Sequence, residues 1–227
     1  MLQDITDIIN LAKDEATRQQ GRLESIRQQL NHDDFKALFT IRAQQAMLSR
    51  KNFQSFVIDD SNREVVNMLY RYIKHIDKVL NPHIGIVLNG AYGCGKSVLI
   101  EAICMVLNDI TFSERNKIQI VHAIELAETI KKTGVIPYCR IPLCIQDIGK
   151  ETKDVNNFGT ILNPISELLA VRAEYGSMTF GSTNMDIPSF HQAYKEYISK
   201  RISEHVNLVF LPGGDRRPNF SINQPKK

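Results

Sequence analysis

The residues best suited to chemistry lie in the stretch GAYGCGKSV, residues 90–98. The spacing G-x-x-x-x-G-K-[ST] is matched there by Gly90, Gly95, Lys96 and Ser97. Such glycines let backbone N–H groups turn toward phosphate oxygens, and the start of the following helix adds partial positive charge. Lys96 is suited to the β- and γ-phosphates of ATP, and the Ser97 hydroxyl to a magnesium ion. The pattern predicts an ATP and Mg²⁺ site formed by Gly90, Ala91, Tyr92, Gly93, Cys94, Gly95, Lys96, Ser97 and Val98.

A carboxylate follows a later apolar run, in the stretch LCIQDIGKE, residues 143–151. ATP hydrolysis needs a carboxylate near magnesium and a group that orients the attacking water. Asp147 is the candidate for both catalysis and metal binding, together with Ser97 as a metal ligand. The preceding residue is Gln146, whose amide can hydrogen-bond a metal-bound water but adds no charge.

Two further polar residues complete the candidate catalytic set. Asn184 follows the apolar run in FGSTNMD, and open α/β sheets bind ligands at the carboxyl ends of their strands. It is a candidate to hold the attacking water or to contact the γ-phosphate. Arg201 lies late in a predicted helix, where it is either a solvated charge or a residue that reaches a neighbouring subunit's γ-phosphate. Spacing alone favours the solvated charge. The catalytic candidates are Lys96, Asp147, Asn184 and Arg201.

The elements that must position these residues alternate along the chain. Strands are predicted at residues 84–88, 118–122, 143–146, 178–182 and 206–211. Helices are predicted at residues 97–107, 124–132, 158–175 with an interruption near 163–164, and 189–203. Strands and helices in alternation imply a parallel five-stranded sheet flanked by helices, which is an α/β fold.

Helical patterns also precede this core. We divide the chain into a helical region (residues 1–50), a core (residues 51–217) and a polar, flexible tail (residues 218–227). The helical region includes a predicted helix at about residues 34–49, and it is either an appendage packed on its own core or a partner-docking module. The next helix is predicted to run to Leu80, with Ser61 as a possible N-cap.

Composition excludes several protein classes. Of the 227 residues, 43% are hydrophobic and 23% are charged, as in ordinary globular proteins. No run approaches eighteen uncharged apolar residues, so no membrane span is expected, and the N-terminus lacks the basic start of a secretory signal. The four cysteines lack metal-binding spacing, which favours reduced core thiols in a cytoplasmic protein. The net charge of +3 is compatible with a nucleic-acid partner.

Taken in order, GAYGCGKS, LCIQDIGKE, FGSTNMD and ISKRISEHVNLVFLPGGDRR resemble the DnaC/IstB-like group of AAA+ ATPases. The resemblance covers about residues 50–217. It implies a P-loop NTPase with an AAA+ core that lacks the helical lid of most AAA+ proteins. By position it gives Asn184 the sensor role and Arg201 the role of an arginine finger. Phe53 and Phe56 would lie near the nucleotide base, or alternatively pack in the core.

Members of this group are bacterial and phage helicase loaders and transposition helpers. The resemblance therefore implies an ATP-binding protein of DNA replication, and we expect a DnaC-like helicase loader. The helical region would dock on a replicative DNA helicase, self-association would pass through Arg201, and single-stranded DNA would contact basic residues of segment 195–217. Two alternatives stay open: an IstB-like transposition helper acting on duplex DNA, and a nucleotide-dependent scaffold with little hydrolysis, which Gln146 supports.

Gln146 departs from the group, which usually has two acids before Ile-Gly. In one register Asp147 takes the second, water-activating position and Gln146 replaces the magnesium-linked acid. In the other register Asp147 is the magnesium-linked acid, and Glu151 would have to help with the water. We prefer the first register because Asp-Ile-Gly fits it, and it predicts that Gln146→Asp raises turnover. Either register implies slow hydrolysis with nucleotide binding retained.

Overall fold

A central parallel sheet dominates the computed structural model, which describes residues 5–151, 155–157, 160–194, 200, 202 and 204–217. The strand order is β2-β3-β6-β1-β7, and every neighbouring pair is parallel. The strands are β1 (Gly85–Asn89), β2 (Gln119–His122), β3 (Leu143–Ile148), β6 (Thr179–Thr183) and β7 (Val206–Phe210). All five were predicted, and the α/β fold class is confirmed.

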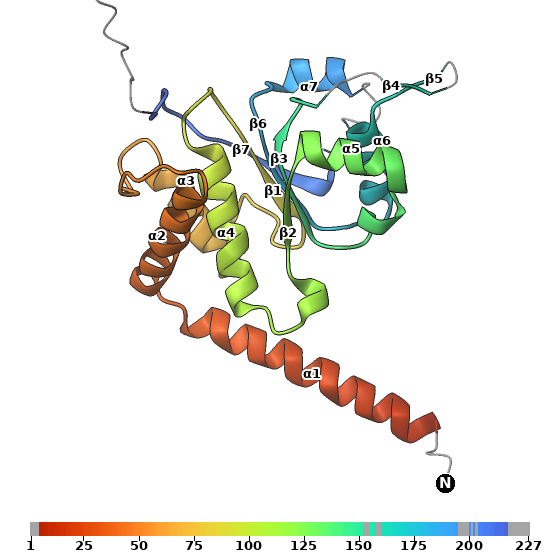
Figure 1. The fold of residues 1–227 in the computed structure, drawn as a ribbon. Helices are drawn as coiled ribbons and strands as arrows, with labels where there is room; N and C mark the ends of the chain where they lie inside the picture. The colour runs from red at the N-terminus through yellow and green to blue at the C-terminus, as the bar shows by residue number, and fades with distance from the viewer. Residues whose placement is uncertain are drawn as a thin grey trace, which may run out of the picture.

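Helices cover both faces of this sheet (Figure 1). One face carries α2 (His32–Ser49), α3 (Arg63–Ile73) and α4 (Lys96–Ile110), and the other carries α5 (Ala123–Thr133) and α6 (Pro164–Glu174). Side chains alternate across β1 accordingly, because successive strand residues point to opposite faces. Ile86 and Leu88 belong to the core under α4, whereas Val87 belongs to the core under α5 and α6. Two short 3₁₀ helices, at Glu114–Asn116 and Ile136–Tyr138, lie in connections.

The helical region contributes to the main core. Phe35 and Phe39 of α2 are fully buried, and they share one hydrophobic cluster with α3 and α4. The side chain of Asn31 caps α2 by accepting hydrogen bonds from the N–H groups of Asp33 and Asp34. By contrast, α1 (Ile5–Gln29) extends away from the core along most of its length (Figure 1). The division at residue 50 stays a prediction, but α2 packs as part of the core.

Two predicted helices begin elsewhere in the structure. A short antiparallel pair, β4 (Val155–Asn157) and β5 (Thr160–Leu162), occupies part of the segment where a helix from residue 158 was expected. Helix α6 begins only at Pro164, because Asn163 caps it by accepting a 3.0 Å hydrogen bond from the Ser166 N–H. Its position before a proline also disfavours helical backbone at Asn163. The helix predicted at 189–203 is present as α7 (Ile187–Ala193), and most residues after it lie outside the described part.

The prediction that Ser61 caps the next helix was wrong. Helix α3 begins at Arg63 with Asn62 at the N-cap, and the Ser61 hydroxyl instead donates a 2.7 Å hydrogen bond to Asp59. The Asp59 carboxylate competes successfully because it also accepts the Ser61 N–H. The helix ends at Ile73 rather than near residue 80, since His75 adopts a left-handed backbone conformation with φ of 56°.

The cysteines are confirmed as core thiols: Cys94, Cys104, Cys139 and Cys144 are all free and buried. Across the residues that the structure describes, no helix has the length and apolarity needed to cross a membrane.

Arg172 of α6 is a buried cation that ties the amino-terminal edge of the sheet together. It is 1% exposed and donates hydrogen bonds to the Thr179 hydroxyl (3.0 Å) and to the backbone oxygens of Ile141 (2.9 Å), Met178 (2.7 Å) and Tyr138. All four acceptors are neutral, so burial lowers the pKa of the guanidinium to about 10. The charge is retained at neutral pH because these oxygens replace its hydration.

Replacing Arg172 should therefore destabilise the fold strongly. We expect Arg172→Met to lower the free energy of unfolding by at least about 3 kcal/mol, because it strands three buried carbonyl groups at about 1–3 kcal/mol each. Urea unfolding followed by circular dichroism measures this. Arg63→Met is the control, since Arg63 pairs with Asp60 on the exposed surface and such pairs contribute about 1 kcal/mol or less. Equal losses in the two variants would contradict the assigned role of Arg172.

Candidate functional site

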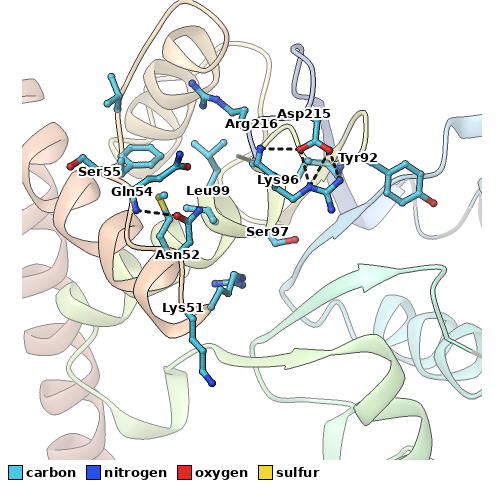
Figure 2. Close-up of a pocket in the computed structure, with 18 of the residues that line it drawn as sticks. Lys51, Asn52, Gln54, Ser55, Tyr92, Lys96, Ser97, Leu99, Asp215 and Arg216 are labelled. Atoms are coloured by element: carbon cyan, nitrogen blue, oxygen red, sulfur yellow. Dashed lines mark hydrogen bonds and ion pairs between the residues drawn. The ribbon is translucent and has the colours of Figure 1, made fainter. Parts of the chain in front are cut away.

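A cavity of about 1680 Å³ opens at the carboxyl edge of the sheet. Its walls come from four segments: the end of α2 with the following loop (residues 47–59), the loop between β1 and α4, the ends of β3 and β6, and residues 215–217. Figure 2 shows Asn52, Gln54 and Ser55 on one side, and Tyr92 and Ser97 on the other. This volume exceeds that of usual small-molecule sites, so a nucleotide would fit.

The predicted phosphate loop connects β1 directly to α4. Gly95 occupies the N-cap of α4 with φ of 104°, a left-handed conformation that glycine adopts without penalty. At Gly90 a side chain could not be accommodated, because an added Cβ would lie 2.4 Å from the Leu211 carbonyl oxygen. The first N–H groups of α4 have no intrahelical acceptor, so they are available to a phosphate group.

Lys96 is folded back onto its own loop. Its ammonium group is largely buried and donates hydrogen bonds to the carbonyl oxygens of Gly90 (2.9 Å) and Ala91 (2.6 Å). Burial lowers the pKa of Lys96, and the neighbouring Cys94 and Asp147 partly oppose this effect. A phosphate at the loop would supply the negative charge that two neutral carbonyl groups lack.

Ser182 of β6 joins the two predicted metal ligands. Its hydroxyl lies 3.3 Å from the Ser97 hydroxyl and accepts a 3.0 Å hydrogen bond from the Asp147 N–H. Asp147 has φ of 59°, next to an irregularity in the pairing of β3 with β6. Its carboxylate borders the cavity and forms a 3.0 Å ion pair with Lys150. The structure therefore brings Ser97 and Asp147 to one wall of the cavity.

Gln146 faces away from this wall, toward α4. It is 1% exposed, and its amide nitrogen donates a 2.7 Å hydrogen bond to the Glu101 carboxylate. Its amide oxygen accepts a 2.8 Å hydrogen bond from Arg50. Both ends of the amide are thus occupied by charged partners from other elements.

Glu151 is buried and does not border the cavity. Its carboxylate accepts a 2.7 Å hydrogen bond from the Gly149 N–H and another from the Tyr194 hydroxyl. Burial, with the adjacent Glu151 charge, raises the pKa of Tyr194, so the phenol stays protonated as the donor. Glu151 holds the turn after β3 in this arrangement. The register in which Glu151 assists the attacking water therefore receives no support from the geometry.

The remaining predicted residues divide into those that reach the cavity and those that do not. Asn184 borders the cavity, as do Tyr92, Gly93, Gly95, Lys96, Ser97 and Val98. Gly90, Ala91 and Cys94 do not, since the first two hold Lys96 through their carbonyl groups and Cys94 is buried in the core. Arg201 lies outside the described residues.

The two phenylalanines proposed to lie near the nucleotide base, Phe53 and Phe56, differ in exposure. Phe56 is partly buried: its ring packs edge-on against Phe39, with ring centroids 6.0 Å apart, and it also lines the cavity. Phe53 is 81% exposed on the cavity wall, so its ring is the more accessible of the two to a base. Gln44 of α2 positions this loop, because its side chain bonds the backbone of both Gln54 (3.0 Å) and Phe56 (2.7 Å).

Sequence reasoning missed the segment after β7, which folds over the phosphate loop. The Arg216 N–H donates a 3.0 Å hydrogen bond to the Gly93 carbonyl group, and the Arg216 side chain pairs with Asp59. Asp215 lies against Gly93, where an added Cβ would meet its carboxylate at 1.9 Å. Its ion pair with Arg217 lowers the pKa of Asp215 to about 2. The sequence pattern of residues 213–217 does not predict this folding back, because it depends on contacts with residues far away in the chain.

The residues present fit a magnesium nucleotide. Ser97 and Asp147 offer the hard oxygen ligands that magnesium prefers. Among the described residues, no group of three or more potential metal-ligating side chains occurs, so the ion would be completed by phosphate oxygens and water. The loop supplies N–H donors and Lys96 for the phosphate groups.

The contact between Gln146 and Glu101 changes the expected effect of Gln146→Asp. The substitution places a second carboxylate against a buried one, so we expect lower stability and no gain in turnover. The pair would hold a proton more tightly in the folded state, and stability relative to the unaltered protein should fall as the pH rises above about 4. Thermal unfolding at pH 5 and pH 8 measures this. Adding Glu101→Gln to Gln146→Asp should restore the stability lost at pH 8. If Gln146→Asp alone is as stable at pH 8 as the unaltered protein, the two carboxylates do not repel each other.

Comparisons with known proteins bear on the fold. No protein-family model matches the chain, and no curated protein sequence does either. Among solved structures, DnaI is 21% identical with a TM-score of 0.54, and the match covers 77% of this chain and 92% of DnaI. A putative primosome component from Streptococcus pyogenes serotype M3 is 18% identical with a TM-score of 0.53, covering 71% and 85%. The DnaC helicase loader is 15% identical with a TM-score of 0.56, covering 75% and 99%.

The TM-scores show similarity of fold over most of this chain. The chain therefore has an α/β fold similar to that of DnaI and the DnaC helicase loader, in line with the resemblance of its motifs.

Proposed function

We propose that this protein is an ATP-binding AAA+ protein of DNA replication that acts as a helicase loader. The observation that carries the proposal is the convergence of Lys96, Ser97 and Asp147 on one cavity, within a fold similar to that of the DnaC helicase loader. Fold alone does not specify function, so the chemistry of the cavity provides the argument for ATP. The similarity to DnaC and DnaI supports a role at a replicative helicase.

Each side chain has a distinct task at the bound nucleotide. The loop amides and Lys96 bind the phosphate groups, and Phe53 offers an exposed aromatic face to the base. Ser97 and Asp147 would hold Mg²⁺, which when bound neutralises charge on the phosphate oxygens. Asn184 lies on the same wall and would orient the attacking water.

Hydrolysis is expected to be slow. The Asp147 carboxylate is paired with Lys150, so it must leave this partner to accept a proton from water. Gln146 cannot provide a charge, and its amide is engaged by Glu101 and Arg50. This geometry also supports the second candidate function, a nucleotide-dependent scaffold with little turnover. Tight ATP binding without stimulation of turnover by helicase or DNA would favour the scaffold.

In this proposal, α1 contacts the helicase, and segment 195–217 contacts a neighbouring subunit and single-stranded DNA. Helix α1 exposes Ile5, Ile9 and Leu11 and projects from the core, which suits a helix that docks on a replicative helicase. Arg201 would reach the γ-phosphate on a neighbouring subunit, so that ATP stabilises self-association. Basic residues of segment 195–217 would contact single-stranded DNA.

The central test is the substitution Lys96→Ala. We expect it to weaken ATP binding between about tenfold and a hundredfold, because a hydrogen bond to a charged group contributes about 1.5–3 kcal/mol. Fluorescence anisotropy of a labelled ATP analogue measures the affinity. Lys131→Ala removes a lysine of α5 that pairs with Glu128 outside the cavity, and it should leave the affinity unchanged. If the two variants bind equally well, ATP does not use this loop.

Helicase loading is tested by assembly. We expect ATP to change the sedimentation of the full chain, both alone and mixed with the replicative helicase of its own host. Arg201→Ala should abolish the ATP effect on self-association, with Arg115→Ala on an exposed 3₁₀ helix as the control. An absence of helicase binding, together with preference for duplex over single-stranded DNA, would instead identify a transposition helper.

A further inference from the structure

Three side chains from separate elements meet behind the cavity wall. They are Arg50 at the C-cap of α2, Glu101 in α4 and Gln146 in β3. The Glu101 carboxylate accepts hydrogen bonds from Gln146 (2.7 Å) and Arg50 (2.5 Å), and Arg50 also donates to the Gln146 oxygen (2.8 Å). We call these residues the Arg50 cluster. Each member contacts both others, so the cluster forms a closed network.

Burial and hydrogen bonding hold the three side chains of the Arg50 cluster in one arrangement. Gln146 is 1% exposed and Glu101 is 8% exposed, and a buried carboxylate is costly unless its hydrogen bonds are satisfied. The charges orient the amide, because its nitrogen must face the carboxylate and its oxygen must face the guanidinium. Arg50 is held in turn by a 2.5 Å hydrogen bond to the Ala46 carbonyl group in the last turn of α2.

The cluster adjoins the residues assigned to magnesium. Ser97 and Glu101 are four residues apart on α4, so they lie on one face of the helix, and helical side chains lean toward the N-terminus. Gln146 immediately precedes Asp147 in β3. The Glu101 carboxylate therefore lies behind the wall formed by Ser97 and Asp147, and Arg50 covers it on the cavity side.

The cavity wall at Ser97 and Asp147 carries less negative charge than two carboxylates would give a magnesium ion. Asp147 is paired with Lys150, so the carboxylate that faces the cavity is already neutralised in part. Magnesium is usually bound with the help of one or two carboxylates. A buried charge acts over a longer range than one in water, because it is less screened.

We propose, on the basis of the nucleotide site described above, that Glu101 is a positioning residue that provides the negative charge missing at Gln146 and so favours magnesium with the nucleotide. Arg50 opposes this effect as its counter-ion. Glu101 acts through Gln146 and the Ser97 wall, without contact with the ion. Since Arg50 ends α2, the placement of α2 sets how strongly the site retains magnesium.

The test is the magnesium concentration that half-saturates binding of a fluorescent ATP analogue, measured at pH 8. Glu101→Gln removes the charge and keeps the shape, so we expect the half-saturating concentration to rise about fivefold. Arg50→Gln removes the counter-ion, so we expect the half-saturating magnesium concentration to fall by a similar factor. A purely structural role would not shift the two variants in opposite directions.

Two further variants keep the test decisive. The double variant Glu101→Gln, Gln146→Glu exchanges the two side chains and so keeps one carboxylate in the cluster. It should restore the original half-saturating magnesium concentration. Arg42→Gln breaks the ion pair between Arg42 and Asp109, which joins the same two helices away from the cavity, and should change nothing. Thermal unfolding establishes that each variant is folded.

The outcomes separate this inference from the proposed function. If the unaltered protein binds the analogue with a magnesium requirement, but Glu101→Gln and Arg50→Gln leave it unchanged or shift it in one direction, the inference is overturned and the proposed function stands. If the unaltered protein binds no nucleotide with or without magnesium, both are overturned. Opposite shifts, restored by the exchange, support the inference.

Discussion

The short turn between β1 and α4 is the constraint on which the rest of the site depends. β1 lies inside the sheet with both faces covered, and α4 buries Ile100 and Ile103 against one of them. The chain must therefore leave β1 and start α4 within residues 90–95, at the carboxyl edge of the sheet. Glycine backbone at Gly95 allows this reversal. The turn places the first amides of α4 and Lys96 where the neighbouring strands also end.

The end of β3 shows how one irregular residue gives two neighbours different environments. The pairing of β3 with β6 shifts between Ile145 and Ile148, and Asp147 adopts a left-handed conformation there. Asp147 borders the cavity, whereas Gln146 lies on the α4 face of the strand, as ordinary strand alternation places it. Ser182 stabilises the arrangement by bonding the Asp147 backbone. A regular strand would also point neighbouring residues to opposite faces, but it would not bend the carboxylate toward the phosphate loop.

Helix α2 links the projecting helix α1 to the cavity at the carboxyl edge of the sheet. Its buried face packs into the main core, Gln44 holds the loop that carries Phe53, and Arg50 reaches Glu101. Two of these contacts thus connect one helix to separate walls of the cavity. Among the described side chains of α1, Leu23 and Ile26 near its carboxyl end pack against this core, and α2 follows directly in the chain.

The pattern of residues alone predicts the sheet, the glycine-rich loop after β1 and the approach of Ser97 and Asp147, because apolar runs, glycine spacing and strand ends are local signals. Other features follow only from the folded arrangement: Gln146 bonds Glu101, Phe53 is exposed while Phe56 is partly buried, and residues 215–217 cover the loop. Such contacts join residues far apart in the chain. They depend on strand register and helix packing, which a pattern of neighbouring residues does not encode.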